Sequence, residues 1–243
     1  MKIAVLMMFR DEEDILERCL EHWLEVCPSV NFYLVDNLSK DRSYEIASKF
    51  TTCIFKENKN DWPGRENYNR LHHIARKEGC DWYFPADADE FLVLPKGYNT
   101  VEEWLTVLDK YSTDWYAHGE LPYLNVLPNG WTGWQQPHRK VFGKFNPDDI
   151  ISMGNHLIEG GTPTLYNMYE GWDNTNSPDC AYYKHYSLRS IEQFKNKMIN
   201  YMEAFHQSVH QTHPHAKDWF VWQEQGEQFF IDRWNALTLP YTV

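Results

Sequence analysis

The sequence has few of the features that mark secreted, membrane-spanning or nucleic-acid-binding proteins. Its five cysteines are odd in number and form no C-x-x-C pair, so neither a disulfide framework nor a zinc knuckle is predicted. It has no apolar run of about 18 residues and no signal-peptide pattern, so we expect a cytoplasmic protein with no transmembrane segment. Lys and Arg total 23 against 35 Asp and Glu, and the net charge of -12 argues against nucleic acid as a partner.

The composition is otherwise that of one globular domain. The 243 residues are 42% apolar and 24% charged, which is enough to bury a full core. Aromatic residues make up 16% of the chain and include eleven Trp, which suits either exposed faces for sugar rings or an aromatic core. Composition alone leaves both interpretations open.

Apolar runs alternate with amphipathic segments through the first third of the sequence. The run 2–9 is continuous, as in a strand buried on both faces of a parallel sheet. Acidic residues and then apolar residues at helical spacing follow it, so a helix comes next. The pattern repeats and predicts an α/β fold. The predicted strands are 2–9, 32–35, 53–55 and 82–84, and the predicted helices are 15–24, 44–50 and 65–78.

The second half is less regular. Its pattern predicts a helix at 101–111, strands at 115–121 and 138–145, and an amphipathic helix at 190–206. Pro, Gly and Asn interrupt 122–137 and 146–181, which are therefore expected to be loops where an acceptor site would be built. The segment 219–234 is expected to be one further helix.

An acidic segment, Asp87-Ala88-Asp89-Glu90-Phe91, directly follows the predicted strand 82–84. Two carboxylates one residue apart at a strand end can converge on one hard cation that prefers oxygen ligands. A solvated acidic turn is the alternative. In a doubly wound sheet ligands bind at the carboxyl ends of strands, where Arg10, Asp36 and Asp87 all fall.

Five motifs in order carry a resemblance to a known family. They are Arg10-x-Glu12-x-x-x-Leu16, Asp36-Asn37-x-Ser39-x-Asp41, Arg65 with Asn69, Asp87-Ala88-Asp89-Glu90-Phe91, and His185-Tyr186-x-x-Arg189-Ser190-x-x-Gln193-Phe194-x-x-Lys197. From Lys2 to about Lys197 the chain resembles glycosyltransferases of the GT-A fold, of the family 2-like and family 92-like groups. It departs from their commonest pattern at Asp11, where Asn is usual, and no clear Glu-Asp dipeptide marks the catalytic base.

The resemblance implies both an architecture and a reaction. The α/β fold would be of the GT-A type, with a Rossmann-like nucleotide-sugar-binding half (1–95) around a mixed, mainly parallel central sheet. A loop-rich acceptor half (96–189) and a C-terminal helical segment (190–243) would complete a single domain. The reaction would move a sugar from a nucleotide-diphosphate donor to a hydroxyl of a carbohydrate or glycoconjugate acceptor, with inversion. Mn²⁺ or Mg²⁺ would neutralise the leaving diphosphate.

The resemblance also implies a metal site. Asp89 would bind the cation directly, Asp87 would either share it or accept from the ribose hydroxyl, and His185 would be the third, distant ligand. An imidazole ligand favours Mn²⁺ over Mg²⁺. The alternative for His185 is a strand-end histidine at the domain surface.

Further residues would contact the substrate. Asp36 would receive an edge of the nucleobase, and Glu12 would brace the nucleotide. Arg65 would lie near the diphosphate, and Asn69 near the base or a loop backbone. Turn caps and solvated helix surfaces are alternative roles for such residues. The substrate-binding residues implied in full are Arg10, Glu12, Asp36, Arg65, Asn69, Asp87, Arg139 (with its neighbour Lys140), Arg189 and Lys197.

The catalytic base must be a carboxylate or His within hydrogen-bond reach of the acceptor hydroxyl. Glu159 and His156 lie in a glycine-flanked segment of the acceptor half and are the first candidates, with Glu120 and Asp114 behind them. A structural loop histidine is the alternative for His156.

Two other functions stay open at this point. A sugar nucleotidyltransferase would share the general scaffold, but it should have a Gly-rich phosphate loop after the first strand, and Met7-Met8-Phe9-Arg10 contains no glycine. A noncatalytic carbohydrate-binding module would explain the aromatics but gives no reason for carboxylates at strand ends.

Overall fold

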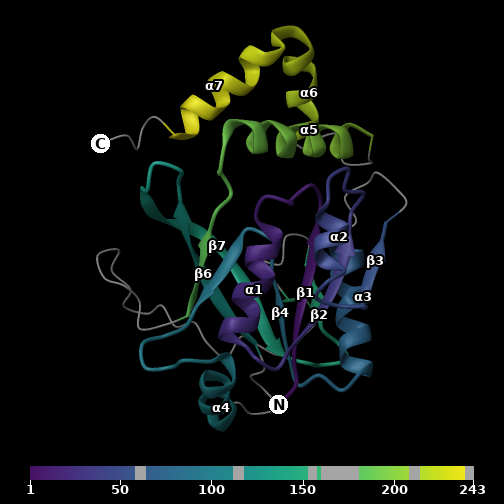
Figure 1. The fold of residues 1–243 in the computed structure, drawn as a ribbon, viewed down its shortest axis with the longest axis vertical. Helices are drawn as coiled ribbons and strands as arrows, with labels where there is room; N and C mark the ends of the chain where they lie inside the picture. Colours follow the sequence, from purple (N-terminus) through teal and green to yellow (C-terminus); the bar gives the residue numbers. More distant parts are fainter. Residues whose placement is uncertain (58–63, 112–117, 153–157, 160–180, 208–213, 239–243) are drawn as a thin grey trace.

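The computed structural model is built on one mixed β-sheet with helices on both faces (Figure 1). It describes residues 1–243 except 58–63, 112–117, 153–157, 160–180, 208–213 and 239–243. The eight strands lie in the order β3-β2-β1-β4-β7-β6-β10-β5. The pairs β1–β2, β1–β4, β2–β3 and β6–β10 are parallel, and β4–β7, β6–β7 and β5–β10 are antiparallel. This confirms the predicted α/β fold with a mixed, mainly parallel central sheet.

The first half is doubly wound, as the sequence pattern predicts. The central strand β1 (Ile3–Phe9) sends alternate side chains into two separate cores. Helices α1 (Leu16–Val26) and α2 (Ser43–Ala47) cover one face, and α3 (Gly64–Lys77) covers the other. Because both faces are covered, β1 has no polar alternation. The other strands of this half are β2 (Val30–Asp36), β3 (Ile54–Lys56) and β4 (Trp82–Pro85).

The region 122–137, expected to be loop, is a long antiparallel hairpin. Its strands are β6 (His118–Val126) and β7 (Thr132–Lys144). The prolines and glycines that suggested a loop have other roles here. The register shifts between Pro122 and Tyr123, where a proline without an N–H is tolerated, and Gly130 has a φ of 85° in the connecting turn. The prediction of loop at 122–137 was therefore wrong.

Four short strands complete the described sheets, and helix α4 (Val101–Tyr111) lies as predicted. Strand β5 (Glu90–Val93) begins inside the acidic segment and pairs with β10 (Tyr182–His185). In the region 146–181 the described residues include β8 (Ile150–Ile151) and β9 (Ile158–Glu159), which form a separate two-stranded sheet. No strand was expected at 90–93, because its partner is 90 residues away in the sequence.

The C-terminal helices form a small core of their own. Helix α5 (Ile191–Gln207) lies across the end of the sheet in Figure 1, and α6 (Pro214–Gln225) and α7 (Glu227–Thr238) pack on it. The single helix expected at 219–234 is interrupted at Gly226, whose φ is 59°, a conformation that glycine adopts at little cost. Helices α5 and α7 share a cluster of five buried apolar residues, Phe194, Met198, Met202, Phe229 and Phe230, and Trp222 of α6 packs against it. No described helix is both long and apolar enough to cross a membrane.

Candidate active site at the carboxyl ends of the strands

The acidic segment forms the tight connection between β4 and β5. Ala86 N–H still bonds to Leu6 O at 3.0 Å, which continues the ladder from β1. The chain then turns, and Glu90 N–H donates to Asp87 O at 3.1 Å. His185 at the end of β10 lies directly opposite Glu90 in the antiparallel register, so the distant histidine is brought to the acidic turn by strand pairing.

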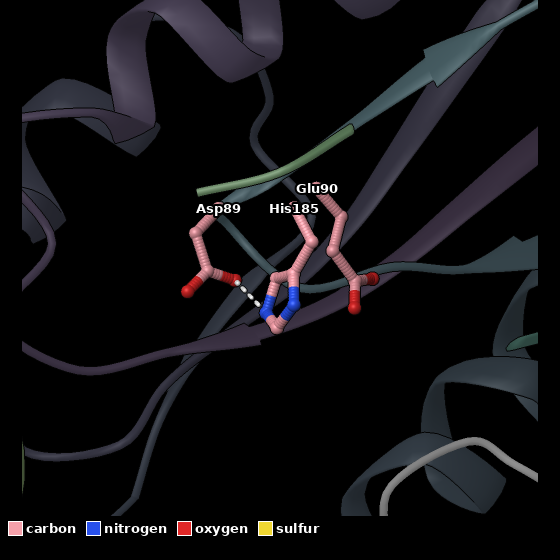
Figure 2. A group of neighbouring side chains, drawn as sticks. All are labelled: Asp89, Glu90 and His185. Atoms are coloured by element: carbon pink, nitrogen blue, oxygen red, sulfur yellow. Dashed lines mark ion pairs between the residues drawn. The ribbon is translucent and has the colours of Figure 1, made fainter. Parts of the chain in front are cut away.

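Asp89 and His185 converge at this turn (Figure 2). Nε2 of His185 lies 3.7 Å from Oδ1 of Asp89, and ligand atoms of Asp89, Glu90 and His185 lie within 4.8 Å of one another. On its other side, Nδ1 of His185 is 3.0 Å from Oδ1 of Asn125. Because Asn125 accepts the Nδ1 proton, Nε2 keeps its lone pair toward Asp89, as a metal-binding imidazole requires. Burial lowers the pKa of His185, which favours this neutral form.

Two cationic side chains balance the charge of Asp89, which is only 3% exposed. The Nζ of Lys197 lies 2.7 Å from Oδ2, and Nη1 of Arg189 lies 3.7 Å from the same oxygen. Burial alone raises the pKa of Asp89, but Lys197 and Arg189 hold it well below its ordinary value. Asp89 is therefore a carboxylate at any physiological pH.

Asp87 has a different environment. Its side chain is 43% exposed, accepts from Tyr68 Oη at 2.9 Å, and pairs with Lys140 Nζ at 2.6 Å. Burial lowers the pKa of Lys140, but Asp87 and Glu90 outweigh this and keep the ammonium charged. Among the described residues, the group that could hold a metal contains Asp89 and His185 but not Asp87. Of the two roles expected for Asp87, contact with the ribose fits this position better than metal binding, and both stay predictions.

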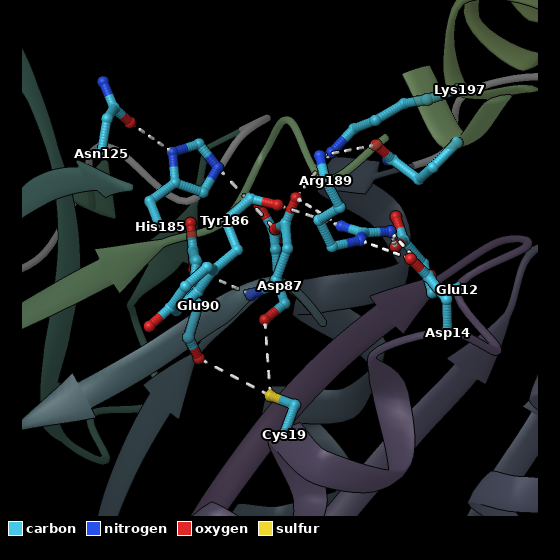
Figure 3. A network of polar contacts seen from close by, with 12 residues as sticks. Glu12, Asp14, Cys19, Asp87, Glu90, Asn125, His185, Tyr186, Arg189 and Lys197 are labelled. Atoms are coloured by element: carbon cyan, nitrogen blue, oxygen red, sulfur yellow. Dashed lines mark hydrogen bonds and ion pairs between the residues drawn. The ribbon is translucent and has the colours of Figure 1, made fainter. Parts of the chain in front are cut away.

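Arg189 ties the acidic turn to the first loop (Figure 3). Its guanidinium bonds to Glu12 Oε2 and to both carboxylate oxygens of Asp14, at 2.7 and 2.9 Å. Arg10 is also buried at this edge, with Nη2 3.5 Å from Glu203 Oε2 on α5. The structure thus brings together the predicted residues Arg10, Glu12, Asp87, Asp89, His185, Arg189 and Lys197.

The end of β2 carries two buried polar residues. Asp36 accepts from Ser39 N–H at 3.0 Å, which is the turn-capping role considered as its alternative. Asn37 is fully buried, and neither of its side-chain amide atoms has a hydrogen-bond partner among the described residues. Leaving two such atoms unpaired costs about 1–3 kcal/mol each. The expected site residues did not include Asn37, although it stands beside Asp36 in the same motif.

Helix α3 carries both Arg65 and Asn69. Asn69 pairs with the backbone of Ile151 through both amide atoms, each at 2.9 Å, and so fastens β8 to α3. Arg65 lines a groove of about 390 Å³ that also contains His72, Arg76 and Asp149. Arg139 lies opposite Pro122 in the β6–β7 pairing. The substrate contacts expected of Arg65, Asn69 and Arg139 stay predictions.

The structure describes the backbones of only two of the four candidate bases. The backbone of Glu159 pairs with Ile150 in the β8–β9 sheet, and the backbone of Glu120 lies opposite Val141 in the hairpin. His156 and Asp114 fall outside the described residues. The assignment of the base therefore stays a prediction.

Three residues of the site were missed as site residues or given another role. Glu90 and Asn125 were not expected to take part, and Lys140 was expected only as a phosphate contact. Glu90 stands in the acidic motif, which could have drawn attention to it. Asn125 reaches His185 only through the parallel pairing of β6 with β10, which no sequence pattern indicates.

Comparison with known proteins gives distant matches only. No protein-family model matches the chain, and no curated protein matches it. A solved structure of S. aureus TarS (residues 1–349, in complex with UDP-GlcNAc) is 15% identical with a TM-score of 0.39, over 52% of this chain and 34% of that chain. Another structure of TarS 1–349 is 12% identical with a TM-score of 0.48, over 99% and 74%.

A third match is the mannosyltransferase PcManGT from Pyrobaculum calidifontis, in complex with GDP-Man and Mn²⁺. It is 12% identical with a TM-score of 0.39, over 49% of this chain and 35% of that chain. In this match, as in the TarS complex, the chain spans about a third of the length of the matched protein. All three matches have identities of 12–15% and TM-scores below 0.5.

Proposed function

We propose that this chain is a metal-dependent glycosyltransferase that moves a sugar from a nucleotide-diphosphate donor to an acceptor hydroxyl, with inversion at the anomeric carbon. The observation that carries the proposal is the convergence of Asp89 and His185. They are 96 residues apart in the sequence, and their ligand atoms Oδ1 and Nε2 lie 3.7 Å from one another at the carboxyl ends of the strands. This is the place where open α/β sheets bind ligands.

The residues present fit a divalent cation. Two bonds of about 2.1 Å from one metal ion can span the 3.7 Å between Oδ1 of Asp89 and Nε2 of His185. The imidazole proton lies on the Asn125 side, so no proton blocks Nε2. Mixed nitrogen and oxygen ligands favour Mn²⁺ over Mg²⁺. Bound there, the cation would neutralise charge on the leaving diphosphate.

The acidic turn is surrounded by paired basic and acidic side chains. Three permanent cations, Lys140, Arg189 and Lys197, are paired with five carboxylates. The carboxylates are Glu12, Asp14, Asp87, Asp89 and Glu90. Burial raises the pKa of Glu12 to about 7 and that of Glu90 to about 8, so near neutral pH both carboxyl groups are partly protonated.

The same basic residues suit the diphosphate. Lys197 and Arg189 come from the C-terminal segment, and Lys140 comes from β7, so they approach the acidic turn from different elements. Guanidinium and ammonium groups that are already held in place stabilise developing phosphate charge without reorganisation. Lys197 and Arg189 would contact the leaving group. The exposed side of Asp87 would accept from the ribose.

Asp36 and Asn37 are the proposed nucleobase contacts. Both are buried at the end of β2, and Asn37 offers one acceptor and two donors that have no partner among the described residues. An amide can pair with a base edge that presents one donor beside one acceptor. Glu159 and His156 remain the proposed bases. Glu159→Gln should lower turnover by roughly 10²–10⁴ with nucleotide affinity little changed, because a base acts in the transition state.

A donor screen tests the proposal. The chain is incubated with a panel of nucleotide sugars with and without Mn²⁺, and release of nucleoside diphosphate is measured. We expect release from at least one donor, its loss with EDTA, and its loss in Asp89→Asn. Asp148→Asn, the same change at an exposed aspartate outside the site, serves as the matched control.

Other outcomes would contradict it. Pyrophosphate release from a nucleoside triphosphate and a sugar phosphate would indicate a nucleotidyltransferase. Sugar binding without metal or nucleotide would indicate a carbohydrate-binding module. Full metal-dependent activity in Asp89→Asn would show that the metal site is elsewhere.

A further inference from the structure

We infer that Glu90 is a positioning residue that holds the acidic turn in shape, and that it does not bind the metal. The inference rests on the proposed function for its consequences in catalysis. Its geometric basis is independent of that function, because it depends on contacts within the turn itself.

Glu90 makes two hydrogen bonds to the backbone of Asp87, one through its own backbone and one through its side chain. Its backbone N–H donates to Asp87 O at 3.1 Å, and its Oε2 accepts the Asp87 N–H at 2.8 Å. The two residues are thereby joined by a pair of hydrogen bonds around Ala88. Cys19 of α1 adds a weak bond from its thiol to Glu90 O at 3.6 Å (Figure 3). The conformation that presents Asp89 to His185 is therefore fixed by Glu90.

The second carboxylate oxygen has its own partner. Oε1 of Glu90 lies 3.4 Å from Nζ of Lys140, and both side chains are only 1% exposed. The same ammonium lies 2.6 Å from Oδ2 of Asp87. Lys140 is thus held between two carboxylates on either side of the turn. Asp87 is the nearer partner of Lys140, so the ammonium still has a carboxylate beside it when the charge of Glu90 is removed.

Proximity to His185 does not make Glu90 a ligand. The two residues are directly opposite each other in the β5–β10 register, and side chains in such pairs lie close together whatever their chemistry. Figure 2 shows Asp89 and Glu90 on different sides of the imidazole, and the dashed contact joins only Asp89 to it. With Oε2 bound to the Asp87 amide and Oε1 facing Lys140, Glu90 already has partners for both oxygens.

Two substitutions separate positioning from metal binding. In Glu90→Gln the amide oxygen still accepts the Asp87 N–H, whereas glutamine is a poor metal ligand. In Glu90→Ala both the acceptor and the charge are lost. Glu102→Gln is the matched control, because Glu102 also accepts a backbone N–H, from Ser29 at 2.9 Å, and lies outside the site.

The measurements are Mn²⁺ affinity by calorimetry, donor turnover, and hydrogen exchange of the Asp87 amide. If Glu90 positions the turn, Glu90→Gln keeps Mn²⁺ affinity within about threefold of the wild type and retains most turnover. Glu90→Ala lowers turnover about 10- to 100-fold, as is usual when support around a metal site is lost. The Asp87 amide is protected in the wild type and in Glu90→Gln and exchanges fast in Glu90→Ala. Glu102→Gln changes none of the three.

Contrary results would overturn the inference. A loss of Mn²⁺ affinity of about tenfold or more in Glu90→Gln would make Glu90 a ligand. Unchanged turnover of folded Glu90→Ala would show that the turn needs no such support. If the wild type has no transferase activity, the proposed function fails, and exchange of the Asp87 amide still decides whether Glu90 holds the turn. If Glu90→Ala does not fold, Mn²⁺ binding by Glu90→Gln decides the matter.

Discussion

The ammonium of Lys197 lies 2.7 Å from Oδ2 of Asp89, the carboxylate proposed to bind the metal. Lys197 belongs to α5, whereas Asp89 lies at the carboxyl ends of the strands, so the C-terminal segment supplies a cation to the metal site. Asp89 is buried and Lys197 is partly buried, and Asp89 keeps the pKa of Lys197 raised although burial lowers it. A metal ion must therefore share Asp89 with Lys197 or displace it.

Replacement of Lys197 should separate metal binding from catalysis. In Lys197→Met the competing charge is gone while the apolar stem is kept, so Mn²⁺ affinity should rise about tenfold, which corresponds to about 1.4 kcal/mol. Turnover should fall about 10²-fold, because a preorganised contact to the leaving diphosphate is lost. Calorimetry with Mn²⁺ and steady-state kinetics measure the two effects.

Lys195→Met is the matched control for this experiment. Lys195 lies on the same helix but pairs with Glu227 of α7 at 2.7 Å, away from the acidic turn. It should leave both Mn²⁺ affinity and turnover unchanged. A fall in Mn²⁺ affinity in Lys197→Met would mean that Lys197 supports the metal site and does not compete for it.

Asn125 should control the metal through His185. Its Oδ1 lies 3.0 Å from Nδ1 of His185 and fixes which nitrogen faces Asp89. Loss of such a partner typically costs 10- to 100-fold in metal affinity, so Asn125→Ala should weaken Mn²⁺ binding by about tenfold. Asn125→Asp keeps an acceptor for the Nδ1 proton and should retain wild-type affinity or exceed it. Equal Mn²⁺ affinity in Asn125→Ala and the wild type would remove His185 from the metal site.

The nucleobase contact should depend on Asn37. Because its amide atoms have no partner among the described residues, Asn37→Ala removes no observed bond and should not lower the free energy of unfolding. It should weaken nucleoside diphosphate binding about tenfold, measured by calorimetry. Asn31 gives the opposite control, since its amide donates to Ile3 O and Ser29 O at 3.3 and 3.0 Å. Asn31→Ala should lower stability and leave nucleotide affinity unchanged.

Sequence reasoning reached the parts of this molecule that depend on local pattern. The continuous apolar run of β1 and the helical spacing in α3, α4 and α5 predicted those elements to within one or two residues. The hairpin β6–β7 was missed because its prolines and glycines occupy a register shift and a turn, where they do not prevent strand pairing. Local composition does not show whether a proline or glycine lies at a turn or irregularity of a strand pair or within its regular hydrogen bonding.

The sequence predicted the two proposed metal ligands of the site, but it did not predict the residues that hold them in position. Asp89 and His185 were identified from motifs, and the structure brings them together. His185 meets Glu90 and Asn125 through the pairings β5–β10 and β6–β10, which join segments about 90 and 60 residues apart in the sequence. Such pairings are tertiary, so neither residue could be assigned from spacing alone.

The last prediction concerns Asn69, which was expected near the nucleobase or a loop backbone. In the structure its Oδ1 accepts the Ile151 N–H and its Nδ2 donates to Ile151 O, both at 2.9 Å. Asn69→Ala leaves these backbone groups unpaired, so it should lower the free energy of unfolding by about 1–3 kcal/mol, measured by urea denaturation. Nucleotide affinity of the folded variant should stay within about threefold of the wild type, because a structural contact outside the acidic turn does not touch the donor. A folded Asn69→Ala variant with unchanged stability and weak nucleotide binding would restore the substrate role that the sequence suggested.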